Sequence, residues 1–177
     1  MNTESLKYAD ETDKCYGLAG MAIGLMVWDA EGLLESINLD APAEEALRLA
    51  PSFYLAQTQR TTAKAAWEQA LHRFRITAAI TVANVTCRAI VHHRLSAISS
   101  DQDAALRIFL ATEGTDLCQL DPDETLSIYH QSLSHCHRIF RHPAVNSIAS
   151  SLASKIINRR VITAYEVFEV LAPLSRL

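Results

Sequence analysis

The sequence is poor in residues that make tight turns, with only five glycines and five prolines in 177 residues. β-Sandwiches and β-barrels need many such turns, so the scarcity argues against both and favours long helices. The longest uncharged runs span residues 15–28 and 76–87, which is short of the roughly 20 residues that cross a bilayer. We therefore expect no membrane segment. Because the acidic N-terminus does not resemble a signal peptide, we expect a cytoplasmic protein.

Several signatures of familiar chemistry are also missing. The sequence contains no GxSxG motif, no Walker loop and no ExxH pattern of the ferritin-like metal proteins. Its four cysteines, Cys15, Cys87, Cys118 and Cys136, lie far apart and form no CxxC pair. This spacing predicts free, buried thiols rather than a zinc knuckle or a disulfide framework. We expect no cofactor and no metal, and the sequence leaves open whether the protein is an enzyme.

The histidines are the other candidate metal ligands. Ligands on one helix must lie three or four residues apart, but His135 and His137 point about 200° apart on a helical wheel. His130 and His137 share a face but are separated by roughly 10.5 Å along the axis. The adjacent His92 and His93 point about 100° apart. None of these pairs is predicted to chelate a metal ion.

Two long apolar stretches are predicted to form the central helices. Residues 14–37 include YGLAGMAIGLMVW, which is apolar on every side of a helical wheel, and residues 62–95 contain neither glycine nor proline. The second stretch has two apolar stripes on roughly opposite sides, so we expect it to lie between partners. Gly17, Gly20 and Gly24 in the first stretch predict close packing of backbones, with a ligand lying against the bare backbone as the alternative.

Capping residues predict the remaining helices. Asp40 with Pro42 indicates a short helix that Pro51 ends, and Gly114 is expected to stop a helix that begins near Ser99. Further helices are predicted over 121–141, 144–158 and 163–171, where Asp121 and Thr163 are the N-caps. The predicted fold is an all-α, single-domain bundle of about six or seven helices with two central apolar helices.

Charge is arranged in blocks along the chain. Net charge is −7 over residues 1–50, +5 over 51–100, −6 over 101–124 and +4 over 125–177. The simplest interpretation is that acidic and basic helices lie side by side and neutralise each other. Alternatively, the last block forms a basic face for an anionic partner. Its residues are Arg138, Arg141, Lys155, Arg159 and Arg160, with His135, His137 and His142 nearby.

A polar stripe lies between the two apolar stripes of residues 62–95. Arg73, Thr77, Asn84 and Arg88 fall within about 60° of one another on the helical wheel. Buried polar residues need partners, and salt bridges to an acidic block would supply them. The alternative is a pocket in which Arg73, Asn84 and Arg88 bind a small anionic ligand.

These observations favour a non-enzymatic helical module that self-associates or binds a protein partner, because signatures of catalysis and nucleotide binding are missing. The alternative is a helical protein or enzyme that binds a small anion in a pocket between helices. Apolar faces on several helices predict a homodimer. Nucleic-acid binding is disfavoured because the basic block lacks an evident stacking platform.

Overall fold

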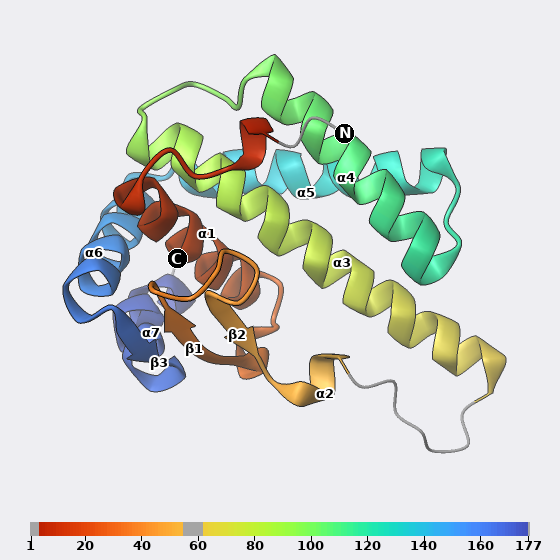
Figure 1. The fold of residues 1–177 in the computed structure, drawn as a ribbon, viewed down its shortest axis with the longest axis horizontal. Coiled ribbons are helices and arrows are strands. Elements are labelled where there is room, and N and C mark those ends of the chain that lie inside the picture. Colours follow the sequence, from red (N-terminus) through yellow and green to blue (C-terminus); the bar gives the residue numbers. More distant parts are fainter. Residues whose placement is uncertain (1–3, 55–61, 177) are drawn as a thin grey trace.

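The computed structural model describes residues 4–54 and 62–176 (Figure 1). The seven α-helices of this part of the chain are α1 (Glu11–Val27), α2 (Pro51–Tyr54), α3 (Ala63–Cys87), α4 (Ser100–Cys118), α5 (Pro122–Phe140), α6 (Pro143–Arg159) and α7 (Ala164–Leu171). The strands are β1 (Leu34–Asn38), β2 (Leu47–Leu49) and β3 (Val161–Thr163). Short 3₁₀ turns span Glu4–Leu6, Glu31–Leu33 and Ala172–Arg176, and a π-helix, Arg88–His92, extends α3. The all-α prediction is confirmed, and a small sheet is added to it.

Helix α3 is the central element, as predicted. It packs against α1 on one side and against α4 and α5 on the other. From Phe74 onward both predicted stripes are buried. The N-terminal turns project beyond this core, and Trp67 is 47% exposed there. The indole nitrogen of Trp67 still donates to the carbonyl oxygen of Cys118, at 3.3 Å.

Glycines bring α1 close to α3. A Cβ atom on Gly20 would lie only 2.5 Å from both the carbonyl oxygen of Ala83 and the Cβ of Cys87. On Gly24 it would meet Ala83 at 3.0 Å. Only residues without a Cβ allow two helices this near. The prediction of close backbone packing is confirmed.

The predicted helix over 14–37 is too long. The structure ends α1 at Val27, and Asp29 adopts a left-handed φ of 52°. Beyond that turn the chain runs as β1, in which Leu34 and Ile37 point into the core. The apolar run of this stretch is too short for its periodicity to distinguish a helix from a strand. Its pairing with one nearby and one distant segment makes it a strand.

The helix predicted between Asp40 and Pro51 is also wrong. The side-chain oxygen of Asn38 accepts a hydrogen bond from the Asp40 amide at 3.0 Å, which starts a turn instead. The Lys14 ammonium group holds that turn by donating to the carbonyl oxygens of Leu39 and Ala41. Strand β2 follows, and Pro51 begins α2 rather than ending a helix.

The later caps agree with the sequence analysis, apart from Gly114. Ser99, Asp121 and Thr163 each cap a helix through a reciprocal capping box. Helix α4 passes through Gly114 and ends at Cys118, and the C-cap residue Gln119 has a φ of 55°. A Cβ on Gly114 would lie 2.8 Å from the Thr125 hydroxyl. This glycine therefore serves close packing of α4 rather than helix termination.

One helical segment of the described chain, Ala63–His92, is long and apolar enough to cross a membrane. Its most apolar window has a mean hydropathy of 1.3, and 83% of that window is buried inside the protein. This is consistent with the core helix of a soluble protein.

Candidate functional site

One edge of the small sheet carries main-chain groups that no neighbouring strand pairs with. The strands are antiparallel in the order β2-β1-β3, so β2 has one side without a neighbouring strand. The main-chain amide of Asn38 donates to the carbonyl oxygen of Ala46, and the main-chain amide of Ala50 donates to that of Leu33, both at 2.7 Å. Since alternate residues of an antiparallel strand bond to the same side, the amides and carbonyls of Leu47 and Leu49 point outward.

Nothing in the described part of the chain occupies this outer edge with a hydrogen bond to Leu47 or Leu49. Both leucines are buried, each with 5% of its surface exposed, which fixes the register and leaves Arg48 exposed on the other face. A bulge at Glu35 of β1, between the pairs Leu34–Leu49 and Ser36–Arg48, further twists this end of the sheet.

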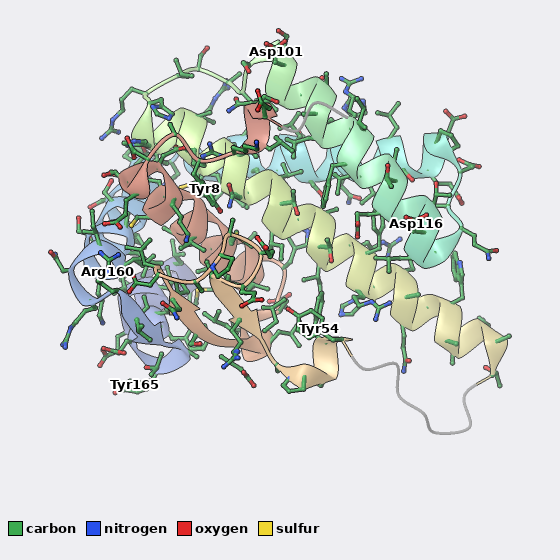
Figure 2. All side chains as sticks on the ribbon, in the orientation of Figure 1. Tyr8, Tyr54, Asp101, Asp116, Arg160 and Tyr165 are labelled. Atoms are coloured by element: carbon green, nitrogen blue, oxygen red, sulfur yellow. The ribbon has the colours of Figure 1, made fainter. Side chains whose placement is uncertain are left out.

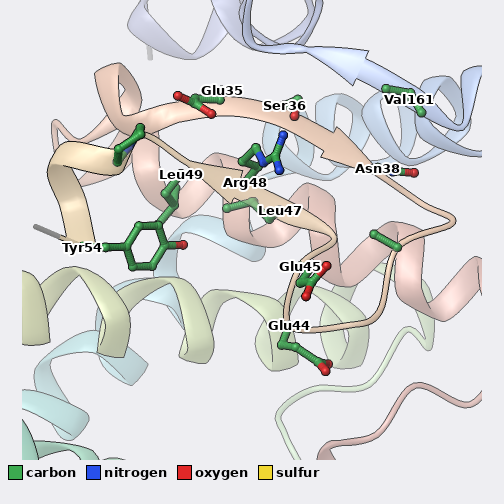
Figure 3. A pocket seen from close by; sticks show the side chains of 12 residues that line it. Glu35, Ser36, Asn38, Glu44, Glu45, Leu47, Arg48, Leu49, Tyr54 and Val161 are labelled. Atoms are coloured by element: carbon green, nitrogen blue, oxygen red, sulfur yellow. The ribbon is translucent and has the colours of Figure 1, made fainter.

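A groove of about 880 Å³ runs over β1 and β2 and along this edge (Figure 3). Its charged lining is acidic, with Glu35, Glu44 and Glu45 against a single base, Arg48. The Tyr54 ring stands at one end of the groove and is 59% exposed. Val161 of β3 also lines the groove and is 54% exposed. The groove therefore combines unpaired main chain, negative charge and exposed apolar side chains.

A buried ion pair joins α1 to the end of α3. The Nε of Arg88 donates to Oδ2 of Asp13 at 2.9 Å, and one terminal nitrogen lies 2.6 Å from the same oxygen. The guanidinium also donates to the carbonyl oxygens of Leu6 and Lys7, at 3.0 and 2.6 Å. Burial opposes the charged form of Asp13, but the bonds from Arg88 and the Ala9 amide outweigh it and lower the pKa of this carboxyl.

A second cavity lies next to this pair. It has a volume of about 660 Å³ and is mostly apolar, with walls that include Leu6, Met21 and Phe109. Its polar lining residues are Lys7, Tyr8, Glu44, Thr81 and Asn84. The side-chain amide of Asn84 donates to the Tyr8 hydroxyl at 2.7 Å. Tyr8 lies on the N-terminal segment over α1 and α3 (Figure 2), and burial raises the pKa of its phenol.

The structure separates the three residues of the predicted anion pocket. Arg88 is held by Asp13 and by backbone carbonyls, as the salt-bridge interpretation predicted. Asn84 lines the cavity beside it. Arg73 lies about 16 Å away along the helix axis, where it donates to the Tyr54 carbonyl at 3.3 Å. Arg73 and Asn84 therefore do not share one pocket.

The predicted basic face is divided among several partners. Arg160 binds the carboxylates of Glu11 and Asp40, which lowers the pKa of both. Lys155 lies 3.6 Å from a carboxylate oxygen of Glu169. Through Arg160 the last, basic block thus lies beside the first, acidic block, as the simpler interpretation of the charge pattern predicted.

Arg138 and Arg141 sit at the end of α5. Arg138 contacts Nδ1 of His135 at 3.0 Å, and Arg141 donates to the Ser96 carbonyl at 2.8 Å. Arg159 is exposed at the end of α6. Burial lowers the pKa of His135 and His137, as do the neighbouring Arg138 and Arg141, so these imidazoles add little positive charge at neutral pH.

All four cysteines are free and buried, which confirms the sequence prediction. Burial raises the pKa of Cys15 to about 11 and holds the pKa values of Cys87 and Cys136 still higher. A thiolate is the nucleophilic form of cysteine. These thiols are therefore packing residues rather than reactive ones.

The sequence analysis missed the sheet edge, because it assigned residues 34–49 to helices. The available signals were the alternation of LRL and the turn residues Asn38 to Pro42 between two short apolar runs. Comparison with known proteins does not supply a function either, since no family model, curated protein or solved structure matches the chain.

Proposed function

We propose that this protein is a non-enzymatic interaction module that binds an extended, basic segment of a partner protein along β2. The observation that carries the proposal is the open edge at Leu47 and Leu49 inside the acidic groove. An added strand would pair with their outward amides and carbonyls, the mode known as β-augmentation. The exposed Tyr54 ring offers an apolar contact at the end of the groove.

The acidic lining of the groove determines which kind of segment it binds. Glu35, Glu44 and Glu45 attract a segment that carries lysine or arginine at alternate positions. A second copy of this chain, paired edge to edge about a twofold axis, would bring its own Glu44 and Glu45 to the same place. Like charges in such an interface oppose binding, so this edge favours a different protein over self-association.

The other partner expectations remain predictions. Self-association would have to use another face, and sedimentation at micromolar concentration would show whether a dimer forms. The ion pairs of Arg160 and Lys155 support the expectation that nucleic acid is not the partner. We further propose a cytoplasmic location, because four free thiols suit a reducing compartment.

Fluorescence anisotropy with labelled peptides tests the proposed function. We expect a pool of short peptides that alternate Lys with Val to contain saturable ligands, and a matched pool with Glu in place of Lys to contain none. N-methylation of the peptide amides that face β2 should abolish binding, whereas N-methylation of the alternate amides should not. Binding that survives both methylation patterns would show that charge attraction alone holds the peptide and that no strand pairs with β2. Either that result or the absence of saturable binding would overturn the proposal.

A second candidate function follows from the cavity beside Asn84. Its volume of about 660 Å³ falls within the range of small-molecule sites. Because the donors of Arg88 are committed to Asp13 and the backbone, we propose a mainly apolar ligand with one hydrogen-bonding group rather than an anion. In thermal-shift screening, Thr81→Phe should abolish any ligand-induced stabilisation, whereas Thr77→Phe, outside the cavity lining, should retain it.

A further inference from the structure

Two histidines at the end of the π-helix lie beside the buried carboxylate of Asp13. His92 is the last residue of the π-helix, and His93 follows it. Their ring centroids are 4.4 Å apart. The potential ligand atoms of Asp13, His92 and His93 all lie within 4.8 Å of one another.

The end of the helix accounts for this arrangement. On a regular α-helix, neighbouring side chains diverge by about 100°, which is why the sequence predicts no shared site. Here the His93 amide donates to the Arg88 carbonyl at 2.9 Å, a bond that spans five residues. The chain then leaves the helix, and Arg94 adopts a left-handed φ of 57°. π-Helical turns of this kind often occur at functional sites.

The carboxylate of Asp13 is held in place for coordination. Its Oδ2 accepts hydrogen bonds from Arg88 and from the Ala9 amide, at 2.9 and 3.0 Å. Its Oδ1 faces Nε2 of His93 at 3.2 Å. A tetrahedral zinc ion with bonds of about 2.0 to 2.1 Å separates its ligand atoms by about 3.3 to 3.4 Å. The two atoms therefore already match one edge of such a site.

His92 can supply a third ligand. Its ring stacks on Tyr16, with centroids 4.5 Å apart and an angle of 15° between the planes. The hydrogen bonds among described residues leave its ring nitrogens unused. The potential ligand atom of His92 lies within 4.8 Å of those of Asp13 and His93. The His93 side chain is 43% exposed, so solvent can reach a fourth position.

We propose that Asp13, His92 and His93 bind a divalent transition-metal ion of the Zn²⁺ class. Two imidazoles and one carboxylate suit Zn²⁺ and Co²⁺, whereas Ca²⁺ and Mg²⁺ prefer sites made only of oxygen. Arg88 serves as the outer partner that orients the coordinating carboxylate. The positive charge of Arg88 is offset by Asp13, so the ion meets a locally neutral pair.

Titration with Co²⁺ tests this proposal, because tetrahedral Co²⁺ gives a visible absorption spectrum that Zn²⁺ then removes by displacement. We expect one equivalent to bind the folded wild-type protein. His92→Ala and His93→Ala should each weaken binding by at least about tenfold. Both side chains lie at the surface end of the helix, so the variants should keep the wild-type circular dichroism spectrum. Thermal melts with Zn²⁺ should show stabilisation of the wild type that His93→Ala lacks.

His72→Ala and His130→Ala are the matched controls, because both residues are exposed on α3 and α5. Neither substitution should change Co²⁺ affinity. Equal losses in the controls would show binding by surface imidazoles and overturn the proposal. The same conclusion follows if Co²⁺ fails to saturate at micromolar concentration, in which case His93 and Asp13 make a hydrogen bond only.

Discussion

The contact of α1 with α3 and the outer edge of β2 differ in whether their polar groups have hydrogen-bonding partners. At the contact of α1 with α3, Arg88 is 3% exposed, and its guanidinium donates to Asp13 and to the carbonyl oxygens of Leu6 and Lys7. At the second, the outward main-chain groups of Leu47 and Leu49 have no partner among the described residues. A buried polar group with hydrogen-bonding partners stabilises the fold, whereas an unpaired polar group in a groove is available to bind a partner molecule.

The largest effect expected from this comparison is in Arg88→Ala. The substitution leaves the Asp13 carboxylate buried without its ion-pair partner, so the free energy of unfolding should fall by about 3 to 5 kcal/mol. Denaturant titration followed by far-UV circular dichroism measures it. Arg73→Ala is the control on the same helix and should change stability by less than about 0.5 kcal/mol. A loss under about 1 kcal/mol in Arg88→Ala would show that the pair is not a structural element.

A smaller effect is expected from a methyl group at the helix contact. In Gly20→Ala the new Cβ would lie 2.5 Å from the Ala83 carbonyl oxygen, and overpacking of this kind costs about 1 to 3 kcal/mol. Gly32→Ala is the matched control, because no atom lies within 4 Å of its added Cβ. That substitution should be neutral or slightly stabilising. If both variants have the same melting temperature, α1 and α3 are not closely packed.

The helical core was predictable because its signals are local. The stripes of α3 repeat over many turns, and the caps at Asp121 and Thr163 depend on residues three positions apart. The pairing of Arg88 with an acidic block also followed from the rule that buried charges need partners. Its partner Asp13 did not, since the two residues are 75 positions apart.

The pairing of β1 with β3 could not be predicted because it joins segments that are distant in the sequence. Strand β1 pairs with β2 nearby and with β3, more than a hundred residues later. The periodicity of residues 34–38 does not reveal which segments they pair with, so the sequence analysis extended the preceding helix to residue 37. The proximity of His92, His93 and Asp13 was hidden for a similar reason: helical wheels assume a regular α-helix, and this one ends in a π-helix.

Acid should weaken the buried pair. The pKa of Asp13 is lower in the folded protein than its ordinary value of about 3.9. Its contribution to stability is therefore present above that value and is lost as pH falls through the folded pKa. We expect the free energy of unfolding to decrease below about pH 4. Arg160→Ala, which removes the exposed pairs with Glu11 and Asp40, should retain this decrease. If it does not, the acid sensitivity comes from the surface pairs.

The smallest change in stability is expected at the sheet edge, where the effect on binding should be large. The Tyr54 side chain is exposed at the end of the groove, so Tyr54→Ala should alter the free energy of unfolding by no more than about 0.5 kcal/mol. The double variant Glu44→Gln/Glu45→Gln should be equally stable, because both side chains are exposed.

In the anisotropy assay, however, both variants should bind the Lys-Val peptides more weakly than the wild type does. Only the glutamine variant should also lose part of the salt dependence, since it removes charge and Tyr54→Ala does not. Glu113→Gln on α4, outside the groove lining, is the charge control and should bind as the wild type does. If Tyr54→Ala is strongly destabilising instead, the β2 edge is a structural part of the fold, and the contrast with the α1–α3 contact fails.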